Sequence, residues 1–168
     1  IAHRCASGSL PEHTLESYDL AIRQGADFIE PDLVITKDGV LIARHENEIS
    51  LTTNVSTVFP ERKSIKIIDG KKITGWFVED FTYREIKILK AKERFNFRTH
   101  AYDNLFSIPS FRDILILLNK KAKELGRSIG VYPETKHPTY FRSINLPLEE
   151  QLIQDLKEFK YHDNNLTF

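Results

Sequence analysis

The alternation of apolar and polar residues is clearest at 28–35, which predicts a strand with two acidic side chains on one face. Successive side chains of a strand point to opposite faces, so Glu30 and Asp32 share one face and the aliphatic residues share the other. Two neighbouring carboxylates in an apolar strand repel each other and resist burial, which favours a compensating cation or basic side chains. The alternative is an edge strand whose acids lie in water. Pro31 favours that alternative because proline removes a hydrogen-bond donor from the ladder.

The other predicted elements are three more strands and four helices. Apolar residues at helical spacing, with glycines after two of the runs and a Thr82–Glu85 capping box, indicate where the helices begin and end. We expect strands at 1–5, 40–45 and 129–136, and helices at 14–24, 82–92, 110–125 and from Pro147 onward.

Residues 46–81 are less regular, and the segments that flank Asp69-Gly70 predict a small hairpin. We therefore expect an insertion at 46–81 within one domain that spans 1–168. Strands that alternate with helices and end in polar residues are typical of a TIM-type (β/α) barrel. A complete barrel takes about 250 residues, so the 168 residues here predict an α/β fold that is the N-terminal half of such a barrel.

The composition is that of a globular domain without a strong charge. Lys and Arg total 24 and so do Asp and Glu, which argues against electrostatic capture of nucleic acid. One cysteine excludes an internal disulfide framework. No apolar run reaches the roughly 20 residues of a transmembrane segment. The chain opens on Ile1 without a signal peptide, so we expect that any leader has been removed or lies outside this segment.

The polar ends of the predicted strands bring together residues with complementary chemistry. Three carboxylates suit a hard divalent cation, two histidines can exchange protons near neutral pH, and two basic residues can neutralise a phosphate. These are the groups that phosphodiester cleavage needs. The simpler alternatives are hydrogen-bonded structural histidines and basic residues that pair with the acids. The candidate residues are His3, Arg4, Glu30, Asp32, His45, Glu134 and Lys136.

A set of short motifs, in this order along the chain, resembles the glycerophosphodiester phosphodiesterase family. The motifs are His3-Arg4, Pro11-Glu12-His13-Thr14, Gly25-Ala26-Asp27, Glu30-Pro31-Asp32, Thr36-Lys37-Asp38-Gly39, His45 and Tyr132-Pro133-Glu134-Thr135-Lys136. The sequences of these motifs are most similar to those of the periplasmic or secreted branch of the family. Members of that branch hydrolyse glycerophosphodiesters to glycerol 3-phosphate and an alcohol in lipid and glycerol metabolism. The resemblance implies a periplasmic or secreted location.

The resemblance also implies a role for each candidate residue. Glu30, Asp32 and Glu134 would hold Ca²⁺ or Mg²⁺, His3 and His45 would be the acid–base pair, and Arg4 and Lys136 would contact the substrate phosphate. The other histidines, His13, His100, His137 and His162, are expected to have no catalytic role.

Two departures from the family pattern support a second hypothesis. Cys5 stands where the family usually has glycine, and the chain stops where family members continue with further strands. The alternative to an enzyme is therefore a truncated, non-catalytic fragment that at most binds a divalent metal or phosphate. Self-association or a second chain would then complete the barrel, since a half barrel exposes unpaired strand edges.

Overall fold

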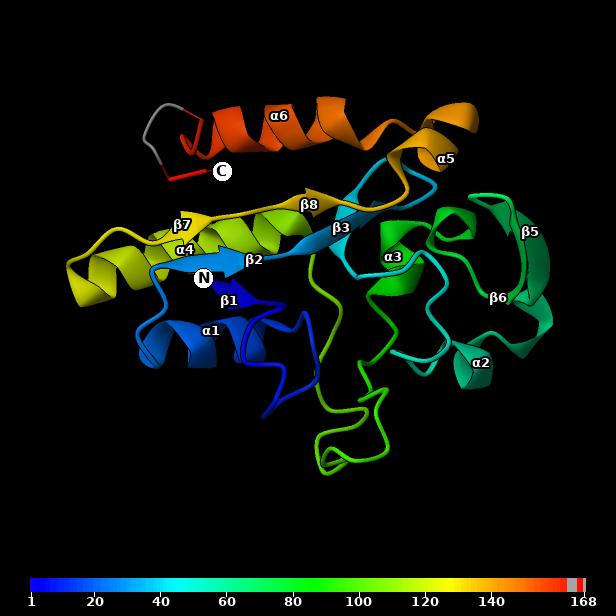
Figure 1. Ribbon diagram of the computed structural model, residues 1–168, viewed down its shortest axis with the longest axis horizontal. Coiled ribbons are helices and arrows are strands. Elements are labelled where there is room, and N and C mark those ends of the chain that lie inside the picture. The colour runs from blue at the N-terminus through cyan, green and yellow to red at the C-terminus, as the bar shows by residue number, and fades with distance from the viewer. Residues whose placement is uncertain (163–165, 168) are drawn as a thin grey trace.

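The computed structural model describes residues 1–162, 166 and 167, and its central strands run side by side (Figure 1). The first sheet has the order β1-β2-β7 and is parallel throughout. In the second sheet, of order β4-β3-β8, β3 is parallel to β8 and antiparallel to β4. The strands are β1 (Ala2–His3), β2 (Phe28–Glu30), β3 (Asp32–Ile35), β4 (Leu41–Ala43), β7 (Gly130–Val131) and β8 (Glu134–Thr135).

Two predicted strands are each interrupted at a proline, because proline has no N–H for the ladder. Pro31 separates β2 from β3, and Pro133 lies between β7 and β8. Hydrogen bonds nevertheless continue the pairing across both breaks, from Tyr132 N to the Ile29 carbonyl and from Glu134 N to the Pro31 carbonyl. The prediction of one continuous strand at 28–35 and another at 129–136 is therefore wrong in detail, but their positions are correct.

Three amphipathic helices cover the strands, and all three were predicted. In Figure 1, α6 lies above the strands, α1 lies below them, and α4 runs behind. Side-chain caps begin two of them: the Thr14 hydroxyl accepts a hydrogen bond from Ser17 N, and the Ser110 hydroxyl accepts one from Asp113 N. Gly126, at φ 62°, ends α4 in the left-handed region that favours glycine. The helices are α1 (Leu15–Arg23), α4 (Phe111–Leu125) and α6 (Leu148–Glu158).

Two other helices differ from the sequence prediction. The predicted helix at 82–92 is only α3 (Tyr83–Ile86), although its capping box is present. The chain then leaves helical geometry because Lys90 and Ala91 bridge to segments far away, with Ala91 N donating to the Phe106 carbonyl. A short helix that was not predicted, α5 (Pro138–Ser143), follows Lys136.

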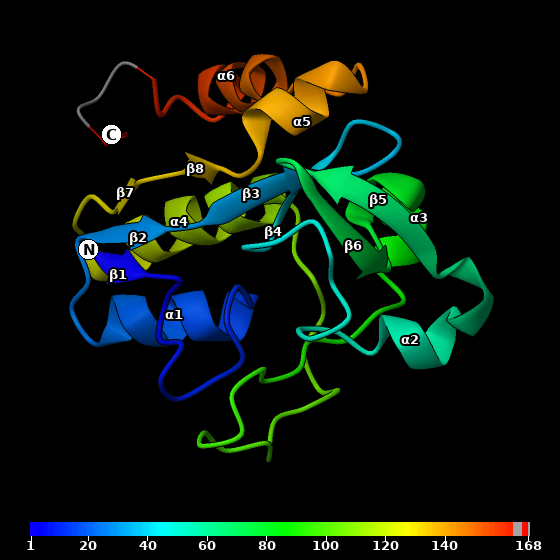
Figure 2. The ribbon, with the colours of Figure 1, turned by 45° about the vertical axis from the view of Figure 1, so that its right-hand side comes forward.

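Residues 46–81 contain the predicted hairpin, seen at the right of Figure 2. Its strands are β5 (Ser64–Ile68) and β6 (Lys71–Gly75), and the turn residues Asp69 and Gly70 both have positive φ. The segment also contains α2 (Val55–Val58) and 3₁₀ turns at Pro60–Arg62 and Val78–Asp80. Ile49, Val55 and Val78 are buried in the main hydrophobic core. The division into a domain and an insertion stays a prediction.

Candidate functional site

The strand register places the predicted site residues next to one another. His3 is the partner of Glu30 in the β1–β2 pair, and Asp32 is the partner of Glu134 in the β3–β8 pair. One carboxylate oxygen from each of Glu30, Asp32 and Glu134 lies within 4.8 Å of the other two. The structure therefore brings together the three acids expected at the strand ends, and their role as metal ligands stays a prediction.

Two of the three carboxylates have oxygen atoms that suit a cation. Oε1 of Glu30 and Oδ1 of Asp32 are both buried. Among the described residues, Glu30 Oε1 has no hydrogen-bond donor, and Asp32 Oδ1 has the Lys136 ammonium 3.3 Å away. A buried carboxylate oxygen without a donor is costly, and a bound cation removes that cost. Glu134 is exposed and completes the set from the solvent side. The donor set fits a hard divalent ion that prefers oxygen ligands.

The electrostatics of the two buried acids differ. Burial and the neighbouring Asp32 carboxylate raise the pKa of Glu30 to about 7. Burial also disfavours ionisation of Asp32, but the hydrogen bond with His13 and the charge of Lys136 outweigh it and lower the pKa of Asp32. Asp32 is therefore the ionised member of the pair, and Glu30 is the member that a cation would ionise.

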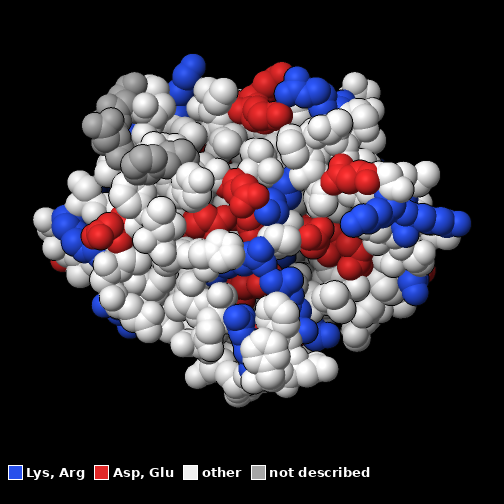
Figure 3. Space-filling view, in the orientation of Figure 1, with Lys and Arg blue, Asp and Glu red and all other residues white. Residues whose placement is uncertain are grey.

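Arg4 and Lys136 lie at the rim of the carboxylate cluster. The backbone N–H of Arg4 donates to Glu30 Oε2 at 2.8 Å, and its Nε atom lies 3.1 Å from Asp32 Oδ2. Lys136 Nζ lies 2.7 Å from Glu134 Oε1 and 3.3 Å from Asp32 Oδ1. Both basic side chains thus pair with acids of the cluster. This is the simpler alternative given in the sequence analysis, in which the basic residues neutralise the acids. Figure 3 shows acidic and basic side chains gathered together in the middle of this face.

The two candidate acid–base histidines line separate cavities that have Glu12 and Arg94 in common. The cavity that contains His3 and Arg4 has a volume of about 320 Å³, and the cavity that contains His45 has about 250 Å³. Burial, together with the nearby Arg4 guanidinium, lowers the pKa of His45. His3 is exposed at the end of β1. Both histidines therefore border accessible space next to the acidic cluster.

His13 also contacts the cluster, although we expected no catalytic role for it from the sequence. Its Nε2 atom lies 3.0 Å from Asp32 Oδ2, and its Nδ1 atom lies 2.7 Å from the Tyr18 hydroxyl. The available signal was its position in the Pro-Glu-His-Thr motif, directly before the N-cap residue Thr14. Glu12 of the same motif was missed too. It is buried and pairs with Arg94 at 3.2 Å.

Cys5 occupies a backbone conformation that favours glycine. Its φ is 68°, in the left-handed region, where glycine has no steric penalty and a residue with a Cβ atom does. The thiol points into the core, where Sγ accepts a hydrogen bond from His13 N at 3.3 Å. Burial raises the pKa of Cys5 to about 12. The sulfur is therefore an inert packing group, as the less reactive interpretation of the sequence expected.

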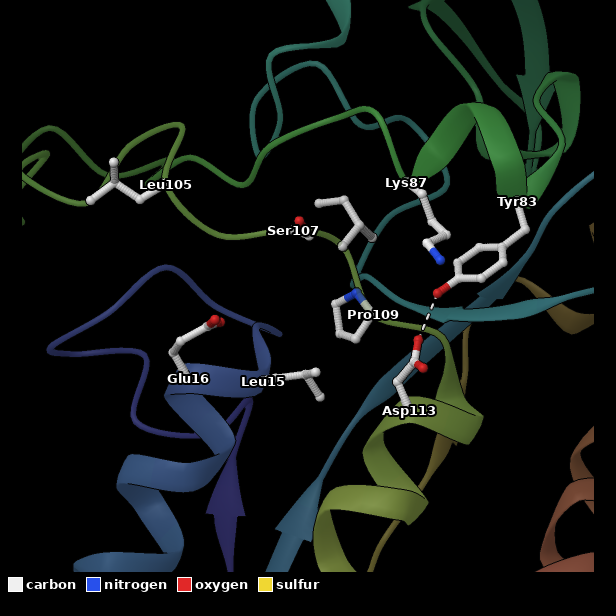
Figure 4. A pocket seen from close by; sticks show the side chains of 9 residues that line it. Leu15, Glu16, Tyr83, Lys87, Leu105, Ser107, Pro109 and Asp113 are labelled. Carbon is white, nitrogen blue, oxygen red and sulfur yellow. Dashed lines mark hydrogen bonds between the residues drawn. The ribbon is translucent and has the colours of Figure 1, made fainter.

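A further cavity, of about 340 Å³, contains none of the predicted site residues (Figure 4). Two of its polar side chains pair with each other. The Tyr83 hydroxyl donates to Asp113 Oδ2 at 2.6 Å, and the same carboxylate oxygen accepts from Ser110 at the start of α4. A helix cap therefore occupies the Tyr83 and Asp113 side of this cavity.

Parallel strands that alternate with helices, with carboxylates and basic residues at the strand ends, define an α/β protein built like part of a TIM-type barrel. The chain belongs to the glycerophosphoryl diester phosphodiesterase family, which it matches over residues 3–164. It is 36% identical over 174 residues to the glycerophosphodiester phosphodiesterase GDPD6 of Arabidopsis thaliana. That match covers 99% of this chain and 46% of the relative. The chain spans about half the length of the curated relatives it matches.

Solved structures agree on the fold. A glycerophosphodiester phosphodiesterase from Agrobacterium tumefaciens superposes with a TM-score of 0.68 at 25% identity, covering 99% of this chain and 54% of the other. A phosphodiesterase from Oleispira antarctica, solved with the product sn-glycerol-3-phosphate, superposes with a TM-score of 0.63 at 21% identity, covering 96% and 53%. The prediction of an α/β fold that is the N-terminal half of a barrel is confirmed.

Proposed function

We propose that this chain carries the metal-binding and acid–base residues for hydrolysis of glycerophosphodiesters to glycerol 3-phosphate and an alcohol. The observation that carries the proposal is the convergence of Glu30, Asp32 and Glu134, together with the buried Oε1 atom of Glu30, which lacks a hydrogen-bond donor among the described residues. Family membership and the product complex of the Oleispira antarctica protein support the substrate class.

The three carboxylates would hold Ca²⁺ or Mg²⁺, which when bound supplies positive charge for the phosphoryl oxygens. Arg4 and Lys136, both at the rim of the cluster, attract and orient the anionic phosphate. Because each of them is already paired with an acid, the phosphate must compete with Asp32 and Glu134 for these cations. This competition favours substrate binding after the carboxylates have been neutralised by the ion.

His3 and His45 exchange the protons of the reaction. Nδ1 of His45 lies 2.8 Å from Glu46 Oε1, and the charge of this carboxylate favours the tautomer with its proton on Nδ1, in which Nε2 is the atom that accepts a proton from the attacking hydroxyl group. Its lowered pKa keeps the ring neutral in neutral solution, as a general base requires. His3, which is exposed and lines the same cavity as Arg4, then protonates the departing alcohol.

The test is release of glycerol 3-phosphate from glycerophosphocholine by the purified chain, with Ca²⁺, with Mg²⁺ and with a chelator. Metal-dependent release that is lost in His3→Ala and His45→Ala supports the proposal. His100→Ala, which changes an exposed histidine bonded to Asp103, is the matched control and should retain activity. Full activity in both His3→Ala and His45→Ala would overturn the acid–base assignment.

A second candidate function is binding of the metal or phosphate without turnover. It is favoured because the chain covers only 46% of the Arabidopsis thaliana relative and 54% of the Agrobacterium tumefaciens structure. Because the chain spans about half of its relatives, the groups that close the substrate pocket can come from a second copy or from another chain. A folded sample that binds Ca²⁺ but releases no glycerol 3-phosphate supports this alternative. Light scattering after gel filtration shows whether turnover, where present, accompanies self-association.

A further inference from the structure

We propose that His13, held by Tyr18, is a positioning residue that orients the Asp32 carboxylate toward the cation site. This inference rests on the metal-binding part of the proposed function. It assigns to a buried histidine a role in shaping the acidic cluster, in addition to its contribution to packing.

The three side chains form one chain of hydrogen bonds inside the protein. The Tyr18 hydroxyl lies 2.7 Å from His13 Nδ1, and His13 Nε2 lies 3.0 Å from Asp32 Oδ2. Each of the three residues has 0% of its surface exposed to solvent. Bulk water therefore does not reach these bonds. His13 is a hydrogen-bonding partner of both Tyr18 and Asp32, and Asp32 also pairs with Arg4 and Lys136.

The direction of the bonds follows from the chemistry of the two ends. A carboxylate only accepts hydrogen bonds, so His13 must donate to Asp32 from Nε2. The neutral ring then has no proton on Nδ1, and the Tyr18 hydroxyl must donate to that atom. Tyr18 thus selects the tautomer of His13 that can hold Asp32. This arrangement uses Oδ2 of Asp32 and leaves Oδ1 facing the other two carboxylates, with the Lys136 ammonium 3.3 Å away.

The backbone of His13 is fixed on both sides, so the ring has little freedom to turn away. Its φ of 57° lies in the left-handed region, and its N–H donates to Cys5 Sγ. The guanidinium of Arg44, itself fully buried, donates to the carbonyl of Glu12 at 2.9 Å and to that of His13 at 3.5 Å. A rigid partner of this kind orients a ligand before the ion arrives, and loss of such a partner typically costs about 10- to 100-fold in metal affinity.

The simpler interpretation is a buried histidine that satisfies its neighbours and stabilises the fold only. The two interpretations differ in metal affinity, because a purely structural contact changes the melting temperature without changing the binding constant of the folded protein. Isothermal titration of the purified chain with Ca²⁺ and with Mg²⁺ measures that constant directly and does not depend on turnover.

Three variants and one control test the proposal. Tyr18→Phe removes only the hydroxyl that selects the tautomer, and we expect about tenfold weaker binding. His13→Leu removes the donor and should weaken binding further, whereas His13→Gln places an amide N–H near the position of Nε2 and should restore affinity to within about threefold of the original. Tyr161→Phe, at a buried tyrosine outside this hydrogen-bonded chain, should bind normally.

The outcomes separate the positioning role from the metal site itself. If the unaltered chain binds neither ion, the metal-binding part of the proposed function fails and this inference fails with it. If the unaltered chain binds an ion and folded Tyr18→Phe binds it equally well, only the positioning role is overturned. Melting curves recorded in chelator show that each variant is folded, and Tyr18→Phe decides the question even where His13→Leu does not fold.

Discussion

Nδ1 of His45 lies 2.8 Å from Oε1 of Glu46, and the second oxygen of the same carboxylate lies 2.9 Å from Nε2 of His137. His137 in turn contacts Asp69 at the turn of the β5–β6 hairpin. The hairpin turn is thereby connected to the proposed general base through two side chains. His137, which the sequence left without a role, joins the hairpin to the site.

Glu46→Gln should lower the pKa of His45 further, because a negative charge that favours the imidazolium is removed. Since Glu46 is half exposed, we expect a shift of about half a pH unit. Titration of the histidine ring signals by NMR measures it. Glu124→Gln, an exposed acid at the end of α4, is the matched control. An unchanged His45 pKa in Glu46→Gln would show that this pair is not formed in solution.

Gly130→Ala should destabilise the protein, because a Cβ atom at this position would overlap the ring of Phe28 on the neighbouring strand β2. The ring must move aside, and we expect the free energy of unfolding to fall by about 1–3 kcal/mol. Urea denaturation measures the change. Gly8→Ala, with no described atom within 4 Å of the new Cβ, should change stability by less than about 0.5 kcal/mol. Equal stability of the two variants would contradict the overlap.

Local signals predicted much of this fold from the sequence. Strand alternation placed Glu30 and Asp32 on one face, and the structure brings their carboxylates together. Helix caps and Gly126 gave the bounds of α4 to within one residue, and Asp69-Gly70 gave the hairpin turn. In each case, the structure is decided by residues within a few positions along the chain.

Features that depend on distant segments could not be predicted. The helix ends at Ile86 because Ala91 further along the chain pairs with Phe106. No pattern in the sequence near Ala91 predicts that contact. His13 reaches Asp32, 19 residues further on, only because its backbone adopts a positive φ and its ring points into the core. The register that pairs Asp32 with Glu134 likewise depends on the packing of the whole sheet.

Cys5 should not react with a thiol reagent in the native protein, since burial raises its pKa to about 12 and keeps it protonated. The chain has one cysteine, so the release of chromophore from Ellman's reagent at pH 8 reports this residue alone. We expect less than one-tenth of a thiol per chain to react within minutes in buffer and a full equivalent to react in guanidinium chloride. Rapid reaction of the native protein would contradict burial of the sulfur.

Metal binding should weaken as the pH falls below 7, because Glu30 must lose its proton to act as a ligand. Burial and the Asp32 carboxylate raise the pKa of Glu30 to about 7, so at lower pH the ion has to displace a proton. For one displaced proton, the apparent binding constant for Ca²⁺ should fall by about tenfold per pH unit below 7. Titration calorimetry in two buffers of different ionisation enthalpy measures both the affinity and the released proton.

The raised pKa of Glu30 also predicts how the stability of the metal-free protein depends on pH. Metal affinity should increase as the pH rises toward 7, whereas the stability of the metal-free protein should decrease. Between pH 4.5 and 7, Glu30 keeps its proton in the folded state and loses it in the unfolded state, so its contribution to the free energy of unfolding decreases as the pH rises. Burial lowers the pKa of His13, so below pH 6.5 the contribution of His13 to the free energy of unfolding increases as the pH rises. The difference between the original chain and Glu30→Gln isolates the carboxyl group, because His13 is present in both. If the two proteins keep a constant difference in stability from pH 4.5 to 7, then Glu30 titrates normally, and the acidic cluster would be open to water in solution.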